Sequence, residues 1–404
     1  MNYREIFELH NLALRQVEKY RRKRFIYSTI AKEKSRHFIG IAGPRGVGKT
    51  VLLRQLAREL KGALYVSLDT LSGSFDLFDF VKEASTYYEV KTFLLDEIHY
   101  LKGYSEQLKK IYDFLSGVRI IFTSSIALWM IESGVDLSRR VRILRMGPFS
   151  FREFLWFREG IKLKPLKIED IISGNWDRKV LEYEYLFDEY LKGGLYPFTL
   201  EEPYPYELFR NIMDRVISKD IPGVRQDIRV GEIENIKKVV DFVGRSPSEG
   251  INYSSIARNT GITKYKAVQY VDLLDKGFIL NRIKPYGTNI TKEPKILMHL
   301  PYRLLYKSYI DCIGSLREDF FAERMKFLRA EIFYLKSKRG EKTPDFLLRG
   351  YKDTIFEIGG KGKGRRQFKG YDASNYNRII LTHPYSPGKF PLLLIGMLEG
   401  EDFQ

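Results

Sequence analysis

The order of apolar and polar residues in the first part of the chain alternates between two patterns. Short apolar runs of strand length lie at residues 37–42, 63–69, 92–97, 118–122 and 141–146. Segments with apolar residues at helical spacing separate several of them, at residues 50–60, 75–84 and 105–115. Buried strands that alternate with amphipathic helices predict an α/β fold for this part of the chain.

The rest of the chain begins with a helical stretch and ends with apolar strands. Helical spacing recurs between about residues 155 and 230, interrupted by Gly193-Gly194 and Pro197. Three helices are then predicted within residues 232–276, with Gly261 in a tight turn, and residues 278–283 are predicted to form strands. This order is typical of a helix-turn-helix with a wing. Apolar strands are predicted near the end, at residues 378–382 and 392–395.

One motif predicts the chemistry of the first part. The pattern G-x-x-x-x-G-K-[ST] is complete between an apolar run and a helix, in Gly43-Pro44-Arg45-Gly46-Val47-Gly48-Lys49-Thr50. The glycines let backbone N–H groups turn toward a polyphosphate at the positive end of the helix. We expect Lys49 to reach the β- and γ-phosphates and the Thr50 hydroxyl to hold Mg²⁺. The motif therefore predicts a nucleotide site.

Polar residues at the ends of two later strands extend this prediction to hydrolysis. The run at 92–97 ends in Asp96, which can hold the water shell of Mg²⁺, and Glu97, which can polarise the water that attacks the γ-phosphate. The next strand ends in three hydroxyl residues. Thr123 or Ser124 can sense the γ-phosphate, and Ser125 can cap a helix expected around residues 127–130.

The order of these residues resembles the prokaryotic AAA-type ATPases that carry a C-terminal winged helix and a restriction-nuclease-like domain. The resemblance covers nearly the full length. It rests on residues 43–50 and on Leu95-Asp96-Glu97-Ile98, Thr123-Ser124-Ser125, Leu137-Ser138-Arg139-Arg140, Gly147-Pro148-Phe149-Ser150-Phe151-Arg152-Glu153-Phe154 and Tyr190-Leu191-Lys192-Gly193-Gly194-Leu195-Tyr196-Pro197. Relatives usually have glycine at the position of Ser124, and a Gly-Arg pair where this chain has Ser138-Arg139-Arg140.

The resemblance implies a parallel five-stranded core and ATP as the nucleotide. It also implies four domains, namely an ATPase core at 1–154, a helical lid at 155–232, a winged helix at 233–296 and a degenerate restriction-nuclease-like domain at 297–404. Arg140 is the residue that matches an arginine finger, which would act on the nucleotide of a neighbouring subunit in a homo-oligomer. Alternatively, Arg140 is a surface residue or part of a local ion pair.

The third helix of the helix-turn-helix has side chains suited to DNA. Its outward positions are predicted to be Lys264, Tyr265, Lys266, Gln269 and Tyr270. These residue types can meet phosphates and base edges of double-stranded DNA. The alternative is a winged helix used for packing or for protein contacts.

Three acidic residues in the C-terminal third follow the order of a restriction-endonuclease core. Glu318 is on a predicted helix, Asp345 follows a proline, and Glu357 begins a Glu-x-Lys pattern whose lysine position is Gly359. Such carboxylates hold Mg²⁺, and the lysine stabilises phosphate charge. The nearest lysine is Lys361, displaced by about 6–7 Å along a strand. We therefore predict a degenerate site, with an ATP-gated nuclease that uses the three carboxylates as the alternative.

Composition bounds these predictions. The 404 residues favour two to four domains, and 44% hydrophobic and 29% charged residues are typical of a soluble globular protein. The net charge of +17 favours a nucleic-acid partner, or else reflects a Lys/Arg-rich, thermophilic proteome. Cys312 is the single cysteine, which excludes a disulfide framework. No apolar run approaches roughly 18 residues, so we expect a cytoplasmic location and no membrane partner.

The sequence thus predicts a protein that binds and hydrolyses ATP with Mg²⁺ and acts as a switch with double-stranded DNA. A signalling scaffold that binds nucleotide without catalysis is the alternative from another functional class.

Overall fold

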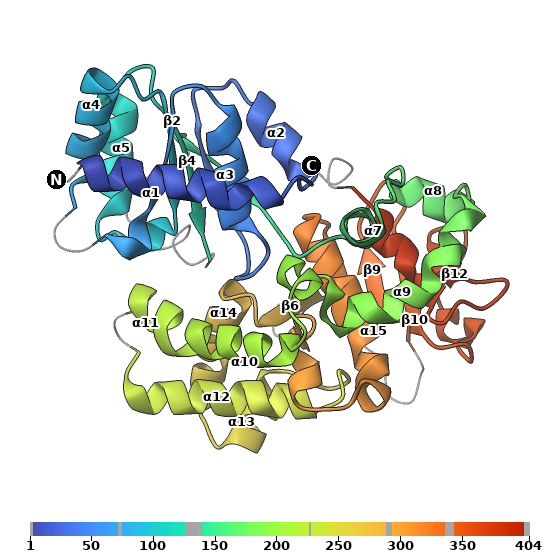
Figure 1. Cartoon of the computed structure of the whole chain (residues 1–404). Coiled ribbons are helices and arrows are strands. Elements are labelled where there is room, and N and C mark those ends of the chain that lie inside the picture. The colour runs from blue at the N-terminus through green and yellow to red at the C-terminus, as the bar shows by residue number, and fades with distance from the viewer. Residues whose placement is uncertain are drawn as a thin grey trace. The chain divides into compact units, whose positions relative to one another are not determined.

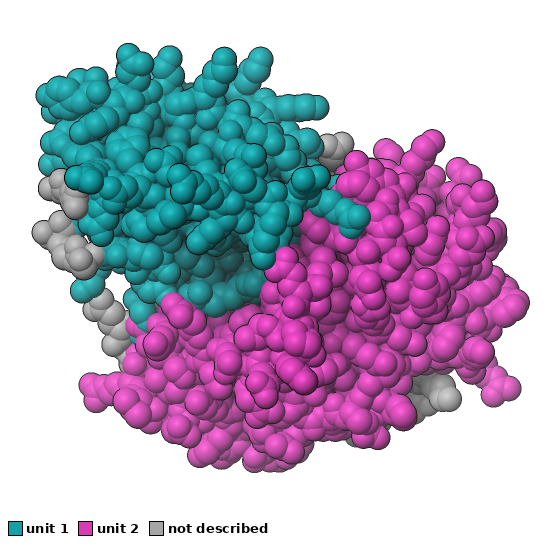
Figure 2. All heavy atoms as spheres, viewed as in Figure 1, with its two compact units in different colours: residues 1–147, 223–226 teal, residues 148–222, 227–404 magenta. Residues whose placement is uncertain are grey.

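The computed structural model describes residues 3–71, 75–125, 137, 139–225, 228–287, 293–335 and 343–399. The helix expected around residues 127–130 and Ser138 lie outside the described residues. The chain divides into two compact units, coloured separately in Figure 2. Unit 1 comprises residues 1–147 and 223–226, and unit 2 comprises residues 148–222 and 227–404.

Unit 1 contains a five-stranded parallel sheet with the order β2-β3-β4-β1-β5. Its strands are β1 Phe38–Ala42, β2 Ala63–Ser67, β3 Thr92–Asp96, β4 Arg119–Ser124 and β5 Val141–Arg145. Every residue of β1 and β3 is buried, as continuous apolar runs require in a parallel sheet. The predicted α/β fold and its five strands are confirmed.

Helices connect and cover these strands (Figure 1). They are α1 Tyr3–Gln16, α2 Ile26–Lys32, α3 Lys49–Glu59, α4 Leu77–Tyr87 and α5 Tyr104–Phe114, with short helical turns at Val17–Lys19, Leu68–Thr70 and Ile98–Tyr100. Helices α1 and α3 contact each other and β2, and α4 packs beside α5. Buried side chains such as Phe80, Leu108 and Phe122 form the core between α4, α5 and the sheet.

In unit 2 the helices α7 to α14 precede the first strand, and α15 lies between the second and third strands. They are α7 Phe151–Glu159, α8 Ile168–Ser173, α9 Glu184–Glu189, α10 Pro205–Arg215, α12 Val230–Arg245, α13 Tyr253–Thr260, α14 Lys264–Lys276 and α15 Tyr309–Phe327, and α11 Ile221–Val224 lies at the boundary of the units. Short helical turns are found at Arg178–Tyr183, Tyr190–Gly194, Pro197–Leu200, Val216–Asp220, Tyr302–Leu305, Arg365–Phe368 and Leu392–Met397.

The three helices predicted within 232–276 are confirmed as α12, α13 and α14. Gly261 ends α13 with a φ of 73°, a conformation that glycine adopts without strain. Thr263 caps the N-terminus of α14, and its side chain accepts the N–H of Lys266 at 3.3 Å.

The strands of unit 2 form one seven-stranded sheet with the order β12-β11-β10-β9-β8-β6-β7. They are β6 Leu280–Pro285, β7 Lys295–Met298, β8 Ile332–Tyr334, β9 Phe346–Leu348, β10 Thr354–Gly359, β11 Asn377–Thr382 and β12 Phe390–Pro391. The antiparallel hairpin of β6 and β7 continues into the C-terminal strands, because β6 pairs in parallel with β8. The hairpin that follows α14 and the C-terminal strands therefore share a sheet.

One predicted strand is wrong. Residues 392–395 lie in a short helical turn whose residues, Leu392–Met397, are all buried. A short run in which every residue is apolar shows neither the spacing of a helix nor the alternation of a strand. Its pattern therefore does not distinguish a buried strand from a buried helical turn. Within the described ranges, no helix is both long and apolar enough to cross a membrane.

Candidate nucleotide site and carboxylate–lysine cluster

The loop between β1 and α3 encloses the amine of Lys49. Gly46 and Gly48 have φ values of 82° and 91°, which favour glycine. Lys49 Nζ donates to the carbonyl oxygens of Gly43 and Pro44 at 2.8 and 2.9 Å. A Cβ atom at Gly43 would lie 2.0 Å from a backbone oxygen, so no other residue fits there. The loop thus has the compact form that the phosphate-binding motif requires at the N-terminus of α3.

Asp96 lies at the carboxyl end of β3, and its carboxylate is hydrogen-bonded to three hydroxyl groups. Tyr65 Oη donates to Asp96 Oδ2 at 2.9 Å, and Thr123 Oγ1 donates to Oδ1. The Thr50 hydroxyl is hydrogen-bonded to the same carboxylate. Burial, followed by the charge of Glu97, raises the pKa of Asp96. The two predicted Mg²⁺ ligands, Thr50 and Asp96, therefore lie side by side.

Glu97 directly follows β3, with a φ of 54°. Its backbone N–H donates to Thr123 Oγ1 at 2.9 Å. Arg45 Nη1 lies 3.8 Å from Glu97 Oε1, and His99 Nδ1 lies 3.3 Å from Oε2. Burial acts to raise the pKa of Glu97, but the charge of Lys49, followed by electrostatic interactions with His99 and Arg45 and a hydrogen bond with Ser125, outweighs burial and lowers the pKa. The side chain is thus held as a carboxylate, the form that can accept a proton.

Ser124 lies beside the phosphate-binding loop. It pairs with Ala42 in the sheet, and its carbonyl accepts the N–H of Gly43 at 3.3 Å. Ser124 Oγ is 3.3 Å from His99 Nδ1. His99 therefore contacts both Glu97 and Ser124, a position that sequence analysis missed. The only feature of the sequence that points to His99 is its position two residues after the acidic pair Asp96-Glu97.

A second residue that sequence analysis missed is Arg24. It ends the basic run at residues 19–24, which suggests a solvated surface. In the structure Arg24 is buried, and its guanidinium donates to the carbonyl oxygens of Val47 at 2.7 Å and Gly147 at 3.0 Å. Arg24 thus holds the phosphate-binding loop at Val47 and joins it to the segment that follows β5.

Arg140 lies away from these residues within one chain. Val141 pairs with Phe38 in the parallel ladder of β5 and β1, so Arg140 precedes the amino end of the strand. The phosphate-binding loop follows the carboxyl end of β1, about 16 Å further along the strand direction. The Arg140 guanidinium donates to both oxygens of Asp113, at 2.9 and 3.0 Å. The role of Arg140 at a neighbouring subunit stays a prediction.

The sequence of this chain is similar to those of known proteins. Residues 35–155, which include all five strands of unit 1, match the model of a family described as AAA domain. Residues 184–299 match a domain of unknown function, DUF8612. The uncharacterised protein MJ1637 of Methanocaldococcus jannaschii is 31% identical over 428 residues, covering 93% of this chain and 90% of that protein. The chain belongs to the same family as MJ1637. Its AAA domain supports ATP binding and hydrolysis in general.

Two solved structures are also similar to this member of the MJ1637 family. C. elegans PCH-2 is 19% identical over 48% of this chain and 58% of that chain, with a TM-score of 0.28. The similarity thus spans little more than half of the PCH-2 chain. AMPPCP-bound DnaA from Aquifex aeolicus is 18% identical over 61% of this chain and 84% of that chain, with a TM-score of 0.24.

Helix α14 presents four of the five side chains predicted to contact DNA. Tyr265 is 69% exposed, and its hydroxyl accepts a hydrogen bond from Gln269 Nε2 at 3.0 Å. The two lysines are also at the surface, where Lys264 forms an ion pair with Glu293 and Lys266 with Glu232. The two lysines therefore offer less positive potential than their sequence suggests.

The prediction that Tyr270 points outward is wrong. Tyr270 is 1% exposed, and its hydroxyl donates to Glu232 Oε1 at 3.3 Å. Its position lies three residues after the buried Ala267 and four before the buried Leu274, so all three share the inner face of α14. Helical spacing therefore places Tyr270 in the core, where its hydroxyl still finds an acceptor.

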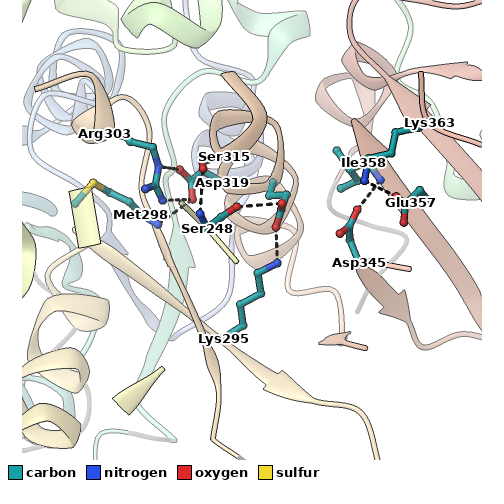
Figure 3. Close-up of polar contacts among 11 residues, drawn as sticks. Ser248, Lys295, Met298, Arg303, Ser315, Asp319, Asp345, Glu357, Ile358 and Lys363 are labelled. Atoms are coloured by element: carbon teal, nitrogen blue, oxygen red, sulfur yellow. Dashed lines mark hydrogen bonds and ion pairs between the residues drawn. The ribbon is translucent and has the colours of Figure 1, made fainter. Parts of the chain in front are cut away.

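The three C-terminal carboxylates interact electrostatically with two lysines. We call Lys295, Glu318, Asp345, Glu357 and Lys363 the carboxylate–lysine cluster, and Figure 3 shows Lys295 apart from the group of Asp345, Glu357 and Lys363. Lys295 in β7 forms an ion pair with Glu318 in α15, and Lys363 after β10 forms one with Glu357. Asp345 directly precedes β9, which pairs with β10 in antiparallel fashion.

The charges of the cluster residues shift one another's pKa values. Burial, followed by the charges of Glu318 and Glu357, raises the pKa of Asp345 to about 7. Burial also raises the pKa of Glu357, against the effect of Lys363. Asp345 Oδ2 accepts the N–H of Ile358 at 2.7 Å, which fixes its orientation. In the described part of the chain, no three His, Cys, Asp or Glu residues are grouped closely enough to hold a metal ion by themselves.

Proposed function

We propose that the chain is a Mg²⁺-dependent ATPase that acts as a switch with double-stranded DNA. The observation that carries this proposal is the gathering of Lys49, Asp96 and Glu97 where the carboxyl ends of the strands meet. Ligands of open parallel sheets bind at that edge. The same edge holds the N-terminus of α3, whose N–H groups attract phosphate.

The residues present fit a magnesium ion with a nucleotide. Thr50 and Asp96 offer adjacent hydroxyl and carboxylate oxygens, the ligand type that Mg²⁺ prefers. The ion would neutralise phosphate charge as the bond to the γ-phosphate breaks. Lys49, which now donates to the loop carbonyls, would turn its amine toward the β- and γ-phosphates.

Glu97 would serve as the base that orients the attacking water. Its pKa is lowered by the surrounding cations, so it remains ionised near neutral pH and can accept a hydrogen bond from water. Ser124 lies where it would sense the γ-phosphate, and Arg45 would approach the phosphates from the loop itself. Hydrolysis would therefore change the charge that this group of residues faces.

Replacement of Glu97 by glutamine tests the ATPase directly. We expect Glu97→Gln to lower the turnover of ATP by a factor of about 100 or more, because a positioned base contributes 10²–10⁴-fold. ATP binding, measured by calorimetry, should change only a few-fold. The exposed Glu106 in the same unit gives a matched control, Glu106→Gln, that should keep full turnover. Undiminished phosphate release by Glu97→Gln would remove Glu97 as the base.

Arg140 is proposed as a finger that completes the site of a neighbouring subunit. Its ion pair with Asp113 offers the other explanation, a purely structural role. The two roles are separated by comparing Arg140→Ala with Asp113→Asn. If Arg140 acts on a nucleotide, Arg140→Ala alone should lower turnover, by about 10³-fold or more. Equal losses in the two variants would assign Arg140 to the ion pair.

The DNA part of the proposal rests on α14. Tyr265 and Gln269 are placed at the surface, and the two lysines beside them would exchange their carboxylate partners for phosphates. A mobility-shift assay with duplex DNA should show binding that weakens steeply as salt rises. The double change Lys264→Ala with Lys266→Ala should reduce the salt slope by about two, whereas exposed Lys238→Ala on α12 should not. No shift at low salt would refute DNA binding.

A further inference from the structure

We propose that a cavity between α1, β2 and α3 binds a small apolar carboxylate, and that Tyr65 transmits its occupancy to the nucleotide site. The ligand has the size of one aromatic ring with a short acid chain. The cavity lies wholly within unit 1, and its ability to bind such a ligand stands on its own residues. The transmission through Tyr65 rests on the proposed ATP site, so the two statements are tested by separate measurements.

The cavity has the volume of a small organic molecule, about 210 Å³. Helices α1 and α3 contact each other and both contact β2, and these three elements supply most of the walls (Figure 1). A cavity of about 150 Å³ with apolar walls accepts benzene. This one therefore has room for a ring and a short substituent. Most of its walls are apolar, formed by Ile6, Leu9, Leu12, Ala13, Val66 and Leu71.

Two of these apolar side chains are open to water. Leu9 is 45% exposed and Leu12 is 51% exposed, although both belong to the face of α1 that lines the cavity. Ile6 and Ala13 on the same helix are each only 5% exposed. The apolar body of a bound ligand would remove the two leucines from contact with water, which favours binding.

The Arg54 guanidinium supplies the charge of the site. Among the described residues that line the cavity, Arg54 is the only charged one, and its guanidinium forms no ion pair with them. Its Nη1 donates to Gln16 Oε1 at 2.9 Å, whereas its Nε is buried without a hydrogen-bond partner. A buried donor without an acceptor is costly, and native proteins rarely keep one without a reason. An acceptor brought by a ligand would satisfy it.

Charge and shape together define the class of ligand. A carboxylate can accept from Nε and from a second N–H of the same guanidinium, in the paired geometry that makes such contacts strong. An amine would be repelled by the guanidinium, and a free phosphate offers no apolar surface to the walls. A group with more than one negative charge would exceed the single cation present. An apolar monocarboxylate meets all of these conditions.

Tyr65 connects the cavity with the nucleotide site. Its ring lines the cavity, with the Arg54 guanidinium 5.1 Å from the ring centre. Its hydroxyl donates to Asp96 Oδ2 at 2.9 Å. Burial, followed by the charge of Asp96, raises the pKa of Tyr65, whereas the charge of Arg54 lowers it. A carboxylate that neutralises Arg54 makes the Tyr65 hydroxyl a weaker donor, so the hydrogen bond to the proposed magnesium ligand changes with occupancy.

Titration of phenylacetate into the full-length protein, followed by NMR of the ligand, tests the cavity. We expect saturable binding by phenylacetate but not by acetate, which lacks the ring, or by phenylethylamine, which carries the opposite charge. Arg54→Met should weaken binding about tenfold or more, because hydrogen bonds to a charged group are lost. Arg58→Met, at an exposed position of the same helix, should leave it unchanged. No saturable binding, or equal affinities in Arg54→Met and the parent, would overturn the proposed site.

A variant that fills the cavity locates the bound ligand. Ala13→Leu adds apolar atoms to the wall formed by α1 and keeps a good helix former at that position. We expect this variant to lose phenylacetate binding while its melting temperature stays close to that of the parent. Undiminished binding by Ala13→Leu would place phenylacetate elsewhere on the protein and refute the assignment to this cavity.

The transmission is tested by repeating the titration with Mg²⁺ and a non-hydrolysable ATP analogue. Linkage requires that the analogue change the affinity for phenylacetate by the same factor as phenylacetate changes the affinity for the analogue. We expect a factor of about five or more, lost in Tyr65→Phe, which keeps the ring and removes the hydroxyl. Equal affinities with and without a bound analogue would refute the transmission. Failure of the analogue to bind at all would instead refute the proposed ATP site.

Discussion

The buried guanidinium of Arg303 in unit 2 allows a quantitative prediction. Arg303 is fully buried, and it donates to Asp319 from Nε at 2.7 Å and from Nη2 at 3.2 Å (Figure 3). Its Nη1 donates to the carbonyl oxygens of Val243 at 3.0 Å and Ser246 at 2.8 Å. Asp319 Oδ1 also accepts the N–H of Met298 at 3.0 Å. The pair therefore joins α12, α15 and β7.

Replacement of Arg303 by leucine leaves a buried carboxylate without its cation and two carbonyl oxygens without their donor. Breaking a buried ion pair on one side costs about 3–5 kcal/mol. That corresponds to a change of roughly a hundredfold to several thousandfold in the unfolding equilibrium. The double change Arg303→Leu with Asp319→Leu should recover most of the loss, because two apolar side chains carry no charge to desolvate.

The pH dependence of the loss has a definite sign. Burial raises the pKa of Asp319 even beside Arg303, and removal of the cation can only raise it further. A carboxyl with a raised folded-state pKa contributes stability below its unfolded pKa, and that stability is lost as pH rises through the folded pKa. The deficit of Arg303→Leu should therefore be small near pH 4 and largest near neutrality.

Hydrogen exchange in a urea series, read on peptides of α12 and α15, measures this effect within unit 2. Local probes are needed because two units need not unfold in one transition. Arg245→Leu removes an exposed pair with Asp241 and should leave the midpoint unchanged. A loss below about 1 kcal/mol for Arg303→Leu, or a deficit that does not vary with pH, would refute this reasoning.

Three further predictions concern single side chains. Thr123→Val removes the hydroxyl that donates to Asp96 and accepts the N–H of Glu97, so ATP turnover should fall about 10- to 100-fold with little change in nucleotide binding. Arg24→Met removes one hydrogen bond to the carbonyl of Val47 in the phosphate-binding loop and one to that of Gly147 after β5. Calorimetry should then show ATP binding about tenfold weaker, whereas unchanged affinity would contradict the support assigned to Arg24. Burial raises the pKa of Cys312 to about 11, so iodoacetamide should alkylate it at pH 8 only after unfolding, and rapid mass addition to the native protein would contradict this.

The parts of the molecule that follow from local pattern could be predicted from the sequence. The phosphate-binding loop is local in the chain, and Asp96 and Glu97 directly follow an apolar run. Because parallel strands align their carboxyl ends, the sequence order alone is enough to bring these residues to one edge of the sheet.

The parts that depend on contacts distant in sequence could not be predicted. Arg24 reaches Val47 and Gly147 only when the fold brings them together. The alkyl chain of Lys363 occupies the space beside Gly359, where a Cβ atom would lie 2.5 Å from it, and this contact depends on the path of a loop that no periodicity describes. Tyr270 shows the opposite case, since its helical spacing already indicates the core and its residue type misled the prediction.

The pairing of β6 with β8 has a mechanical consequence. Helix α14 is followed by β6, while Asp345 directly precedes β9 and Glu357 lies in β10 of the same hydrogen-bonded sheet. Because α14 packs on β6 and hydrogen bonds join β6 to the C-terminal strands, a displacement of α14 relative to β9 and β10 would have to bend or break this sheet.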